Sequence, residues 1–499
     1  MASSFAYQKM VKDFVWNRPD TFNFATDVVD KWAAETPDTP VLWWIDGAGL
    51  EVKLSYEELA CSSRKFCNVL QSAGVKKGDL VLVIMKPQPA WWEIVTACLR
   101  MGVVVSPGTT QLSSKDLEYR LEVSEAACVI ADADNAHKFD AIELDHPALE
   151  CKIVVGAERE GWIHYQQAME ETSDEFLSPG TKADDVSMCY FTSGTTGYPK
   201  MVLHTQASYG IGHKITGHYW LRLTPGELMW CITDTGWAKA AYSALFGPMI
   251  QGATIFSVGV GFDPVKTLEI LRDYPIDALC GAPTIYRLLV QQDLSQYSTQ
   301  GLKRCYGAGE PLNPEVIAAW KAFTGLTIRE GYGQTETCIV CASWDEIEIR
   351  PGSMGKAAPG YDLHVVDAHE RELTCPGCRF GKGMSHEERA HQAGSCSGRH
   401  TVEVIGVNAR IRKGFVSQGA DRFDVGPGGH LRDDSTETGM KVDLRGEDIG
   451  ERFGATNHRN RRLVATGLKR EDRRIHVSRS AYSAESMSWA HMISASPSS

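Results

Sequence analysis

The sequence predicts a layered α/β fold with largely parallel sheets over residues 1–368, followed by an irregular, poorly packed region over residues 369–499. The first part alternates short apolar runs with helix-length segments, and this alternation is typical of parallel sheets covered by helices. The composition then changes, because twelve of thirteen tryptophans and fifteen of sixteen tyrosines lie before residue 369. We therefore expect a large folded domain and then a region with too few large apolar side chains to pack a core.

The apolar runs predict buried strands, and the longer segments between them predict helices. The expected strands are Leu80–Met85, Ala126–Ala131, Ser187–Thr192, Ala253–Val258, Ala278–Ala282 and Leu302–Gly307. The expected helices are Trp91–Met101, Pro264–Tyr274, Thr284–Asp293 and Pro314–Phe323. Proline or asparagine near the start of several of them is a typical N-terminal signal. Ligands of such folds bind at the carboxyl ends of the strands, so polar motifs at these ends are the first candidates for a binding site.

Length and charge exclude several classes of function. A chain of 499 residues is long enough for two or more domains. Residues 369–499 hold 21 Lys+Arg against 17 Asp+Glu, which is a net charge of +4. Because the whole chain has a net charge of −12, residues 1–368 carry a net charge of −16. This acidic body argues against a nucleic acid as partner. No apolar run approaches the roughly 20 residues of a membrane-spanning helix. The oligomeric state is left open.

The expected location is the cytoplasm. The fourteen cysteines are scattered singly through apolar segments, which is typical of reduced, buried thiols rather than of a secreted disulfide framework. The mitochondrial matrix is the alternative, because the first twenty residues contain Lys9, Lys12 and Arg18. Asp13 and Asp20 lie among these cations, however, and transit peptides are poor in acids.

The segment FTSGTTGYPK, residues 191–200, follows one of the predicted strands. Its glycines let backbone N–H groups converge, its hydroxyls add donors and its lysine adds a mobile positive charge. Together these features predict a loop that binds a polyphosphate. The common nucleoside-triphosphate loop GxxxxGK[ST] does not fit, because Lys200 follows Pro199 rather than a glycine. The alternative is a polar surface turn, since Gly, Ser, Thr and Pro dominate turns in general.

Two further polar segments follow predicted strands. The sequence GAGEP, residues 307–311, has small residues that would let a flat ring approach the backbone. The sequence EGYGQTE, residues 330–336, combines an aromatic ring, two glycines, a hydroxyl and a carboxylate. Tyr332 could stack on a base, and Glu336 could hold a magnesium ion that bridges phosphate oxygens. Each segment alone could be a solvated loop, but the three in this order indicate a nucleotide site.

The chain resembles the adenylate-forming acid–thiol ligases, which comprise acyl-CoA synthetases, luciferases and peptide-synthetase adenylation domains. FTSGTTGYPK and YGQTE carry this resemblance most strongly. Within the superfamily the chain is similar to the medium-chain acyl-CoA synthetases over about residues 20–368. The segments that carry this narrower likeness are FNFATDVVDKWA, PVLWWID, TDTGWAKAAYS, APTIYRLLVQ, GAGEPLNPEV, EGYGQTET and RPGSMGKAAPGYD.

The resemblance implies a role for each matching residue. A clamp for the ATP phosphates is implied for Thr192, Ser193, Gly194, Thr195, Thr196, Gly197 and Lys200. Contacts with the adenosine and the α-phosphate are implied for Gly309, Glu310, Pro311, Glu330, Gly331, Tyr332, Gly333, Gln334 and Thr335. The acyl pocket would be bordered by Trp237, Gly281, Thr284 and Gly307, with Thr335 at the carboxylate. The magnesium ligands would be Thr195 and Glu336, and the catalytic residues Lys200, Thr335 and Glu336. For Trp237 and the small residues, an ordinary core position is the alternative.

The implied reaction uses ATP, Mg²⁺ and coenzyme A to activate a medium-chain fatty or aromatic acid. The carboxylate attacks the α-phosphorus, pyrophosphate leaves, and the thiol of coenzyme A then displaces AMP from the acyl-AMP. Positioning and electrostatics carry the first step, because the nucleophile is already ionised. The alternatives are an impaired variant or a nucleotide-binding pseudoenzyme that lacks the machinery for thioester formation, and a binding protein whose function lies in residues 369–499.

Residues 369–499 depart from the family pattern. Family members carry a C-terminal domain with Tyr-x-Thr-Gly-Asp and Gly-Arg-x-Asp-Asp segments and a late lysine, and none of these is found in this chain. We expect this region to be largely disordered or to derive from a shifted reading frame. A zinc site is the competing interpretation, with short spacings that disfavour it, at Cys375, Cys378, His386, His391 and Cys396. The arginine-rich stretch 458–474 is expected to be a solvated charge run rather than a nucleic-acid surface.

Overall fold

The computed structural model describes residues 2–140, 142, 148–192, 198–299 and 301–363, together with four short strands further along the chain. Those strands are β17 (Val407–Asn408), β18 (Met440–Val442), β19 (Leu463–Ala465) and β20 (Arg474–Ile475), paired in the order β18-β19-β17-β20. The suggested zinc ligands between residues 375 and 396 lie outside the described residues.

The first large sheet has seven strands in the order β7-β6-β5-β3-β4-β8-β9. Its strands pair in parallel except for the antiparallel hairpin of β8 and β9. Their bounds are β3 (Leu80–Ile84), β4 (Val104–Gly108), β5 (Cys128–Asp132), β6 (Cys151–Val155), β7 (Ile163–His164), β8 (Val186–Thr192) and β9 (Lys200–Thr205).

The second sheet has nine strands in the order β16-β15-β14-β13-β12-β10-β11-β1-β2. The run from β14 to β1 is parallel, and antiparallel strands close both edges. The bounds are β1 (Pro40–Ile45), β2 (Glu51–Ser55), β10 (Leu228–Cys231), β11 (Thr254–Val258), β12 (Ala278–Gly281), β13 (Arg304–Ala308), β14 (Ile328–Gly333), β15 (Ile339–Ala342) and β16 (Lys356–Ala357). The predicted α/β class with largely parallel sheets is confirmed.

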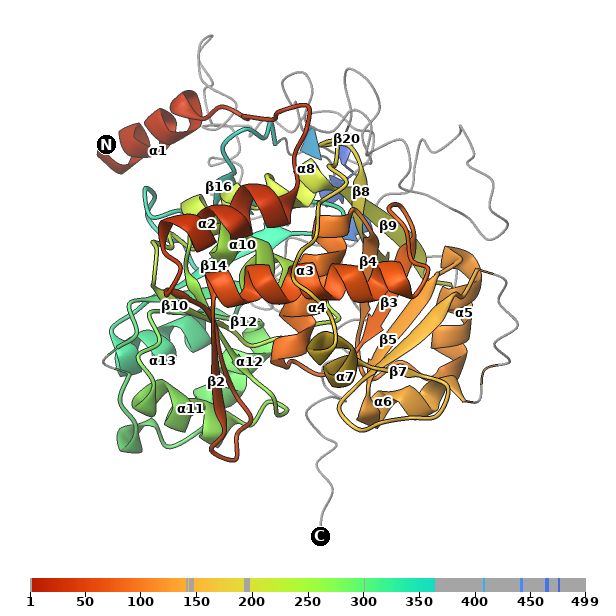
Figure 1. Ribbon diagram of the computed structural model, residues 1–499. Helices are drawn as coiled ribbons and strands as arrows, with labels where there is room; N and C mark the ends of the chain where they lie inside the picture. Colours follow the sequence, from red (N-terminus) through yellow and green to blue (C-terminus); the bar gives the residue numbers. More distant parts are fainter. Residues whose placement is uncertain are drawn as a thin grey trace.

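Helices cover the sheets and fill the space between them (Figure 1). The α-helices are α1 (Ala2–Asp13), α2 (Asp30–Glu35), α3 (Tyr56–Ser72), α4 (Pro89–Met101), α5 (Ser114–Ser124), α6 (Ala133–Ala136), α7 (Tyr165–Glu170), α8 (Gln206–Gly210), α9 (Ala238–Ala241), α10 (Gly247–Ile250), α11 (Pro264–Asp273), α12 (Pro283–Leu289) and α13 (Pro314–Thr324). Short π- and 3₁₀-helical segments are η1 (Ala25–Val29), η2 (His137–Phe139), η3 (Ile215–Trp220), η4 (Tyr242–Phe246) and η5 (Leu294–Gln296).

The strand pattern explains the layers. In β3, Val81 and Val83 face the largest core cluster, which also contains α3, α4 and residues of the nine-stranded sheet. Their neighbours Leu82 and Ile84 face a second cluster under α5, because side chains alternate between the two faces of a strand. A third cluster lies between the nine-stranded sheet and α11 to α13. The Trp92 indole nitrogen, which donates to a carbonyl of η4 at 2.8 Å, helps join the layers across the largest core.

The predicted elements agree with the structure to within a few residues. Helix α4 begins at Pro89, two residues before the predicted start, because proline suits the first turn of a helix. Helix α12 ends at Leu289 rather than at Asp293. The Asp293 carboxylate accepts a hydrogen bond from the Ser295 backbone N–H and thereby caps η5, which competes with continuation of the helix.

Candidate active site

The predicted phosphate loop connects the two strands of the β8–β9 hairpin. Thr192 and Lys200 are register partners at the base of this loop, so the lysine enters β9 opposite the last residue of β8. On the far side, Tyr119 of α5 donates a hydrogen bond to the Pro199 carbonyl at 2.9 Å, and its ring stacks on Tyr198 with centroids 5.1 Å apart. Helix α5 therefore supports the end of the loop that leads into Lys200.

The central part of the loop lies outside the described residues. It contains five predicted phosphate or metal contacts, namely Ser193, Gly194, Thr195, Thr196 and Gly197.

Three neighbouring strands of the nine-stranded sheet bring predicted residues together at their carboxyl ends. Gly281 of β12 is the register partner of Gly307 of β13, and Gly307 is the partner of Glu330 of β14. Ala308 pairs with Gly331 one residue further on. Residues from segments separated by up to fifty positions therefore lie side by side at one edge, as the parallel arrangement predicts.

The Glu330 side chain ties β14 to the segment after β13. Its carboxylate accepts a hydrogen bond from the Leu312 backbone N–H at 3.0 Å. Burial raises the pKa of Glu330 to about 7, although this hydrogen bond acts in the opposite direction. Gly309 has a φ of 107°, which only glycine adopts without strain, so the turn after β13 depends on it.

Glu310 belongs to a polar cluster at the start of α12. The Thr284 hydroxyl donates to its carboxylate at 3.0 Å, and Arg287 lies 3.5 Å from the same oxygen. Arg287 also donates to the Pro311 carbonyl at 3.2 Å. The first turn of α12 therefore anchors the GAGEP segment. Thr284, which the resemblance assigns to the acyl pocket, contacts Glu310, which it assigns to the nucleotide.

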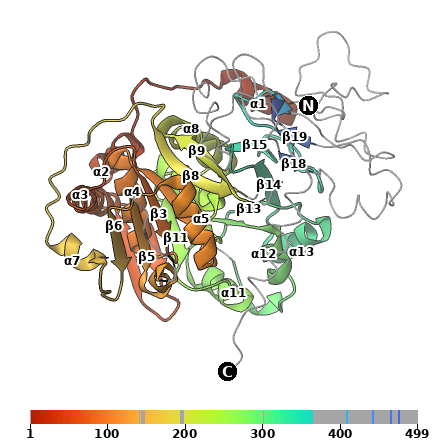
Figure 2. The same ribbon diagram turned by 90° about the vertical axis from the view of Figure 1, so that its right-hand side faces the viewer.

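The carbonyl oxygen of Thr335 joins the two sheets. It accepts a hydrogen bond from His204 Nε2 at 2.6 Å and one from the Tyr209 hydroxyl at 2.5 Å. His204 follows Lys200 by four residues in β9, and Tyr209 lies in α8. In Figure 2, β8 and β9 lie next to β14 and β15. The lysine-bearing hairpin and the EGYGQTE segment are thus fixed to each other.

The protonation state of His204 follows from its partners. A carbonyl only accepts, so Nε2 carries the proton, and Nδ1 accepts from the Ser208 hydroxyl at 3.1 Å. Burial lowers the pKa of His204 to about 3, against a smaller opposing effect of the Thr335 carbonyl. The imidazole is therefore neutral and stacks on the Tyr209 ring, with centroids 3.5 Å apart.

The rest of the EGYGQTE segment is tightly packed. The Tyr242 hydroxyl donates to the carbonyls of Gln334 and Thr337. A Cβ on Gly333 would lie 2.6 Å from the Cys338 carbonyl oxygen, and one on Gly331 would lie 2.5 Å from the ring of a buried tryptophan, Trp220. Glycine is required at both positions because nothing larger fits against these neighbours.

Tyr332 and Glu336 are the third and the last residues of this segment. Tyr332 is buried, with 8 % of its surface exposed. Burial and, to a smaller degree, the Glu336 carboxylate raise the pKa values of Tyr209 and Tyr242, so this carboxylate lies close to the phenols that hold the segment. An oxygen ligand of this kind suits Mg²⁺. In the part of the chain that the structure describes, no three His, Cys, Asp or Glu side chains form a group that could hold a metal on their own.

The predicted acyl-pocket residues come from four elements, with Trp237 before α9, Gly281 in β12, Thr284 in α12 and Gly307 in β13. Trp237 precedes α9, and Lys239 in this helix donates a hydrogen bond from Nζ to the Ala308 carbonyl at 2.9 Å. Helix α9 is therefore attached to the end of β13, beside Gly307 and Gly281.

Sequence reasoning missed several residues that organise this site, namely His204, Tyr209, Tyr242, Lys239 and Arg287. For His204 a signal existed, because strand alternation places it on the same face of β9 as Lys200. The other four act through hydrogen bonds between distant segments, which no local pattern reveals.

The fold defines an adenylate-forming enzyme class. A solved Brucella canis acyl-CoA synthetase superposes with a TM-score of 0.66 at 27% identity, covering 75% of this chain and 69% of that one. The anthranilate CoA ligase AuaEII, solved in complex with anthranoyl-AMP, has the same fold with a TM-score of 0.69 at 21% identity, covering 80% and 71%. The AMP-binding enzyme family matches residues 29–382, and the chain belongs to this family.

Curated relatives are more similar in sequence. The mitochondrial acyl-coenzyme A synthetase ACSM3 of Pongo abelii is 45% identical over 375 residues, which are 74% of this chain and 64% of that protein. The mitochondrial ACSM4 of Rattus norvegicus is 46% identical over 359 residues, 70% of this chain and 62% of that protein. The chain thus spans less than two thirds of the length of these relatives.

Proposed function

We propose that this protein uses ATP and Mg²⁺ to convert a carboxylic acid into an acyl-AMP and then transfers the acyl group to coenzyme A. The observation that carries the proposal is the double hydrogen bond to the Thr335 carbonyl, which fixes the predicted phosphate hairpin against the predicted adenosine segment. Membership of the AMP-binding family and the names of the similar synthetases support the same reaction.

The residues divide the work of the first step. Lys200 would offset negative charge on the departing pyrophosphate, while Thr335 would orient the attacking carboxylate at the α-phosphate. Tyr332 would lie against the adenine. Glu336, with Thr195 from the loop, would hold Mg²⁺, which when bound neutralises charge between the phosphate groups. Two anions that repel in water would thereby be aligned for in-line attack.

We propose a medium-chain fatty or aromatic acid as the substrate. The support is the similarity to acyl-coenzyme A synthetases and the position of Trp237, which precedes a helix attached to the end of β13. Gly281 and Gly307, two further predicted contacts of the acyl chain, lie side by side at the strand ends.

We further propose that residues 1–368 form the adenylate-forming domain and that residues 369–499 are not part of it. The family match extends to residue 382, but the C-terminal family motifs are absent from the sequence. The nucleotide sequence around codon 369 tests one origin of this difference, a shifted reading frame. A frame change that restores a Thr-Gly-Asp segment and a late lysine would establish the shifted frame, and an unbroken frame would contradict it.

The decisive experiment measures pyrophosphate release from the full chain with ATP, Mg²⁺ and octanoate or benzoate, with and without coenzyme A. Stimulation by coenzyme A together with thioester formation is the expected result. Release that does not depend on the thiol would instead identify the impaired variant, and nucleotide binding without release would identify a pseudoenzyme. We expect Lys200→Ala and Glu336→Ala each to abolish release. Lys321→Ala, on the exposed surface of α13, is the matched control and should retain the full rate.

We propose the mitochondrial matrix rather than the cytoplasm as the site of action. The similar ACSM proteins are named mitochondrial, and the N-terminal segment carries Lys9, Lys12 and Arg18. Among the described residues, no helix is sufficiently long and apolar to cross a membrane. Imaging of the full chain with a C-terminal fluorescent tag tests the proposal, and diffuse cytoplasmic fluorescence would contradict it.

A further inference from the structure

Two cysteines face each other across neighbouring strands next to the candidate site. Cys231 ends β10, and Cys280 is its register partner in β12. Parallel neighbours lie about 4.8 Å apart, so their side chains share one face and their Cα separation falls within the range that a disulfide spans. Both thiols are reduced in the structure.

The surroundings of this pair favour loss of a proton. The neighbouring Cys231 thiol and, to a smaller degree, the Lys239 ammonium lower the pKa of Cys280 to about 6 against the opposing effect of burial, whereas burial raises the pKa of Cys231. A hydrogen bond donor and a nearby cation stabilise a thiolate, which is the reactive form of cysteine.

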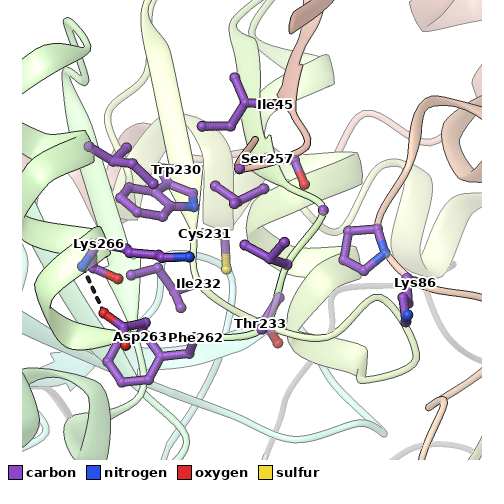
Figure 3. Close-up of a pocket in the computed structure, with 18 of the residues that line it drawn as sticks. Ile45, Lys86, Trp230, Cys231, Ile232, Thr233, Ser257, Phe262, Asp263 and Lys266 are labelled. Atoms are coloured by element: carbon purple, nitrogen blue, oxygen red, sulfur yellow. Dashed lines mark hydrogen bonds between the residues drawn. The ribbon is translucent and has the colours of Figure 1, made fainter. Parts of the chain in front are cut away.

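A small oxidant can reach the pair from a cavity of about 640 Å³ at the carboxyl ends of β10, β11 and β1. Figure 3 shows the Cys231 sulfur among the side chains that line this cavity. Cys280, on the neighbouring strand, does not line the cavity and is fully buried. One sulfur is thus reachable from the cavity, while its partner is shielded.

The chain contains a second pair with the same geometry in a different environment. Cys128 of β5 and Cys151 of β6 are also register partners on parallel strands. Burial and neighbouring thiols raise the pKa of Cys128 well above its ordinary value, and no cation acts on it. This pair separates the effect of strand geometry from the effect of the electrostatic environment.

We propose that Cys231 and Cys280 form a redox-active dithiol that closes to a disulfide on exposure to hydrogen peroxide. Cys231, the reachable sulfur, passes its proton to the Cys280 thiolate and attacks one peroxide oxygen, the O–O bond breaks and hydroxide leaves, which gives a sulfenic acid on Cys231. The second thiol attacks the sulfenic sulfur, the S–S bond forms and a second hydroxide leaves. The two thiol protons convert the hydroxides to water, so two thiols and one peroxide yield one disulfide and two water molecules.

The disulfide would also affect the candidate site, and this part of the inference rests on the proposed function. Cys280 directly precedes Gly281, which lies beside Gly307 at the strand ends. A bond between β10 and β12 at this level would shift the edge on which the acid is proposed to bind. We expect acid activation to fall in proportion to the bridged fraction and to recover on reduction.

The test treats the full chain with dilute hydrogen peroxide, blocks the remaining thiols with N-ethylmaleimide at timed intervals and maps disulfide-linked peptides by mass spectrometry. The Cys231–Cys280 bridge should form at least ~10-fold faster than the Cys128–Cys151 bridge, because thiolate character controls the rate. Dithiothreitol should reverse it, and Lys239→Met should slow it several-fold without changing the second pair. Equal rates for the two pairs, or no bridge between Cys231 and Cys280, would overturn the proposal.

Peptide mapping needs no enzymatic activity, so its result does not depend on the proposed function. Pyrophosphate release is measured on the same samples. A bridge that forms as expected without any loss of release would overturn the link between the dithiol and acid activation.

Discussion

The two hydrogen bonds to the Thr335 carbonyl should be strongly interdependent. Tyr209→Phe removes one donor and keeps the ring, while His204→Leu removes the other at similar volume. Each single change leaves one donor, so each should cost only the net value of a hydrogen bond, about 1 kcal/mol. The double variant leaves a carbonyl between buried side chains with neither donor, which adds a desolvation penalty of about 1–3 kcal/mol. The double variant should therefore lose more free energy of unfolding than the two single variants together, by at least about 1 kcal/mol.

Urea denaturation followed by tryptophan fluorescence measures these free energies of unfolding, and the four proteins form a double-mutant cycle. His204→Gln is the matched control, because its amide nitrogen can take the place of Nε2 and should recover most of the loss. Pyrophosphate release should fall in the same order, since the carbonyl positions Thr335. Additivity within about 0.3 kcal/mol would refute the reasoning, because it would mean that water replaces the lost donors.

Three further predictions concern pH, packing and nucleotide binding. Between pH 7 and pH 5 the wild type should lose about 2 kcal/mol more free energy of unfolding than His204→Gln. The reason is that the imidazole of the unfolded chain, with its ordinary pKa of 6.5, binds a proton in this range, whereas that of the folded protein, with a pKa of about 3, does not. Equal losses of unfolding free energy in the two proteins, measured by urea titration, would contradict this. Gly331→Ala should destabilise the protein by about 1–3 kcal/mol through overpacking, whereas Gly261→Ala, where no atom lies within 4 Å, should leave the thermal midpoint unchanged. Thr284→Val should weaken ATP binding in calorimetry by roughly 2- to 10-fold because Glu310 loses a hydrogen-bond donor, while Thr284→Ser should bind normally.

Much of the fold follows from local patterns in the sequence. Each predicted strand and helix exists, because runs such as Leu80–Ile84 are apolar on both faces and Pro89 marks the start of a helix. The order of strands in the two sheets could not be predicted, since β10 lies between β11 and β12 through contacts that no local signal encodes. The loss of the last turn of α12 likewise depends on competition from the Asp293 cap.

The candidate site, like the fold, could be predicted only in part from the sequence. Motif resemblance predicted roles for Gly307, Glu330 and Thr335, and the structure brings the first two together by strand register. It did not identify the partners that hold these residues. Tyr242 lies about ninety positions before the carbonyls that it binds, and a tyrosine in an apolar helix gives no sign of such a role. Supporting contacts of this kind are properties of the folded chain rather than of any segment.

The placement of His204 illustrates why the supporting contacts must be neutral. Its imidazole lies between the strand that carries Lys200 and the segment that carries Glu336, which is where a triphosphate, a metal ion and a carboxylate are proposed to meet. A permanent extra cation at this point would pair with Glu336 and compete with the magnesium ion. Burial prevents this, because it holds the pKa of His204 near 3 and keeps the ring as a donor without charge. The protein can thus fix the geometry with His204, and charge neutralisation is left to the roles proposed for Lys200 and a metal ion.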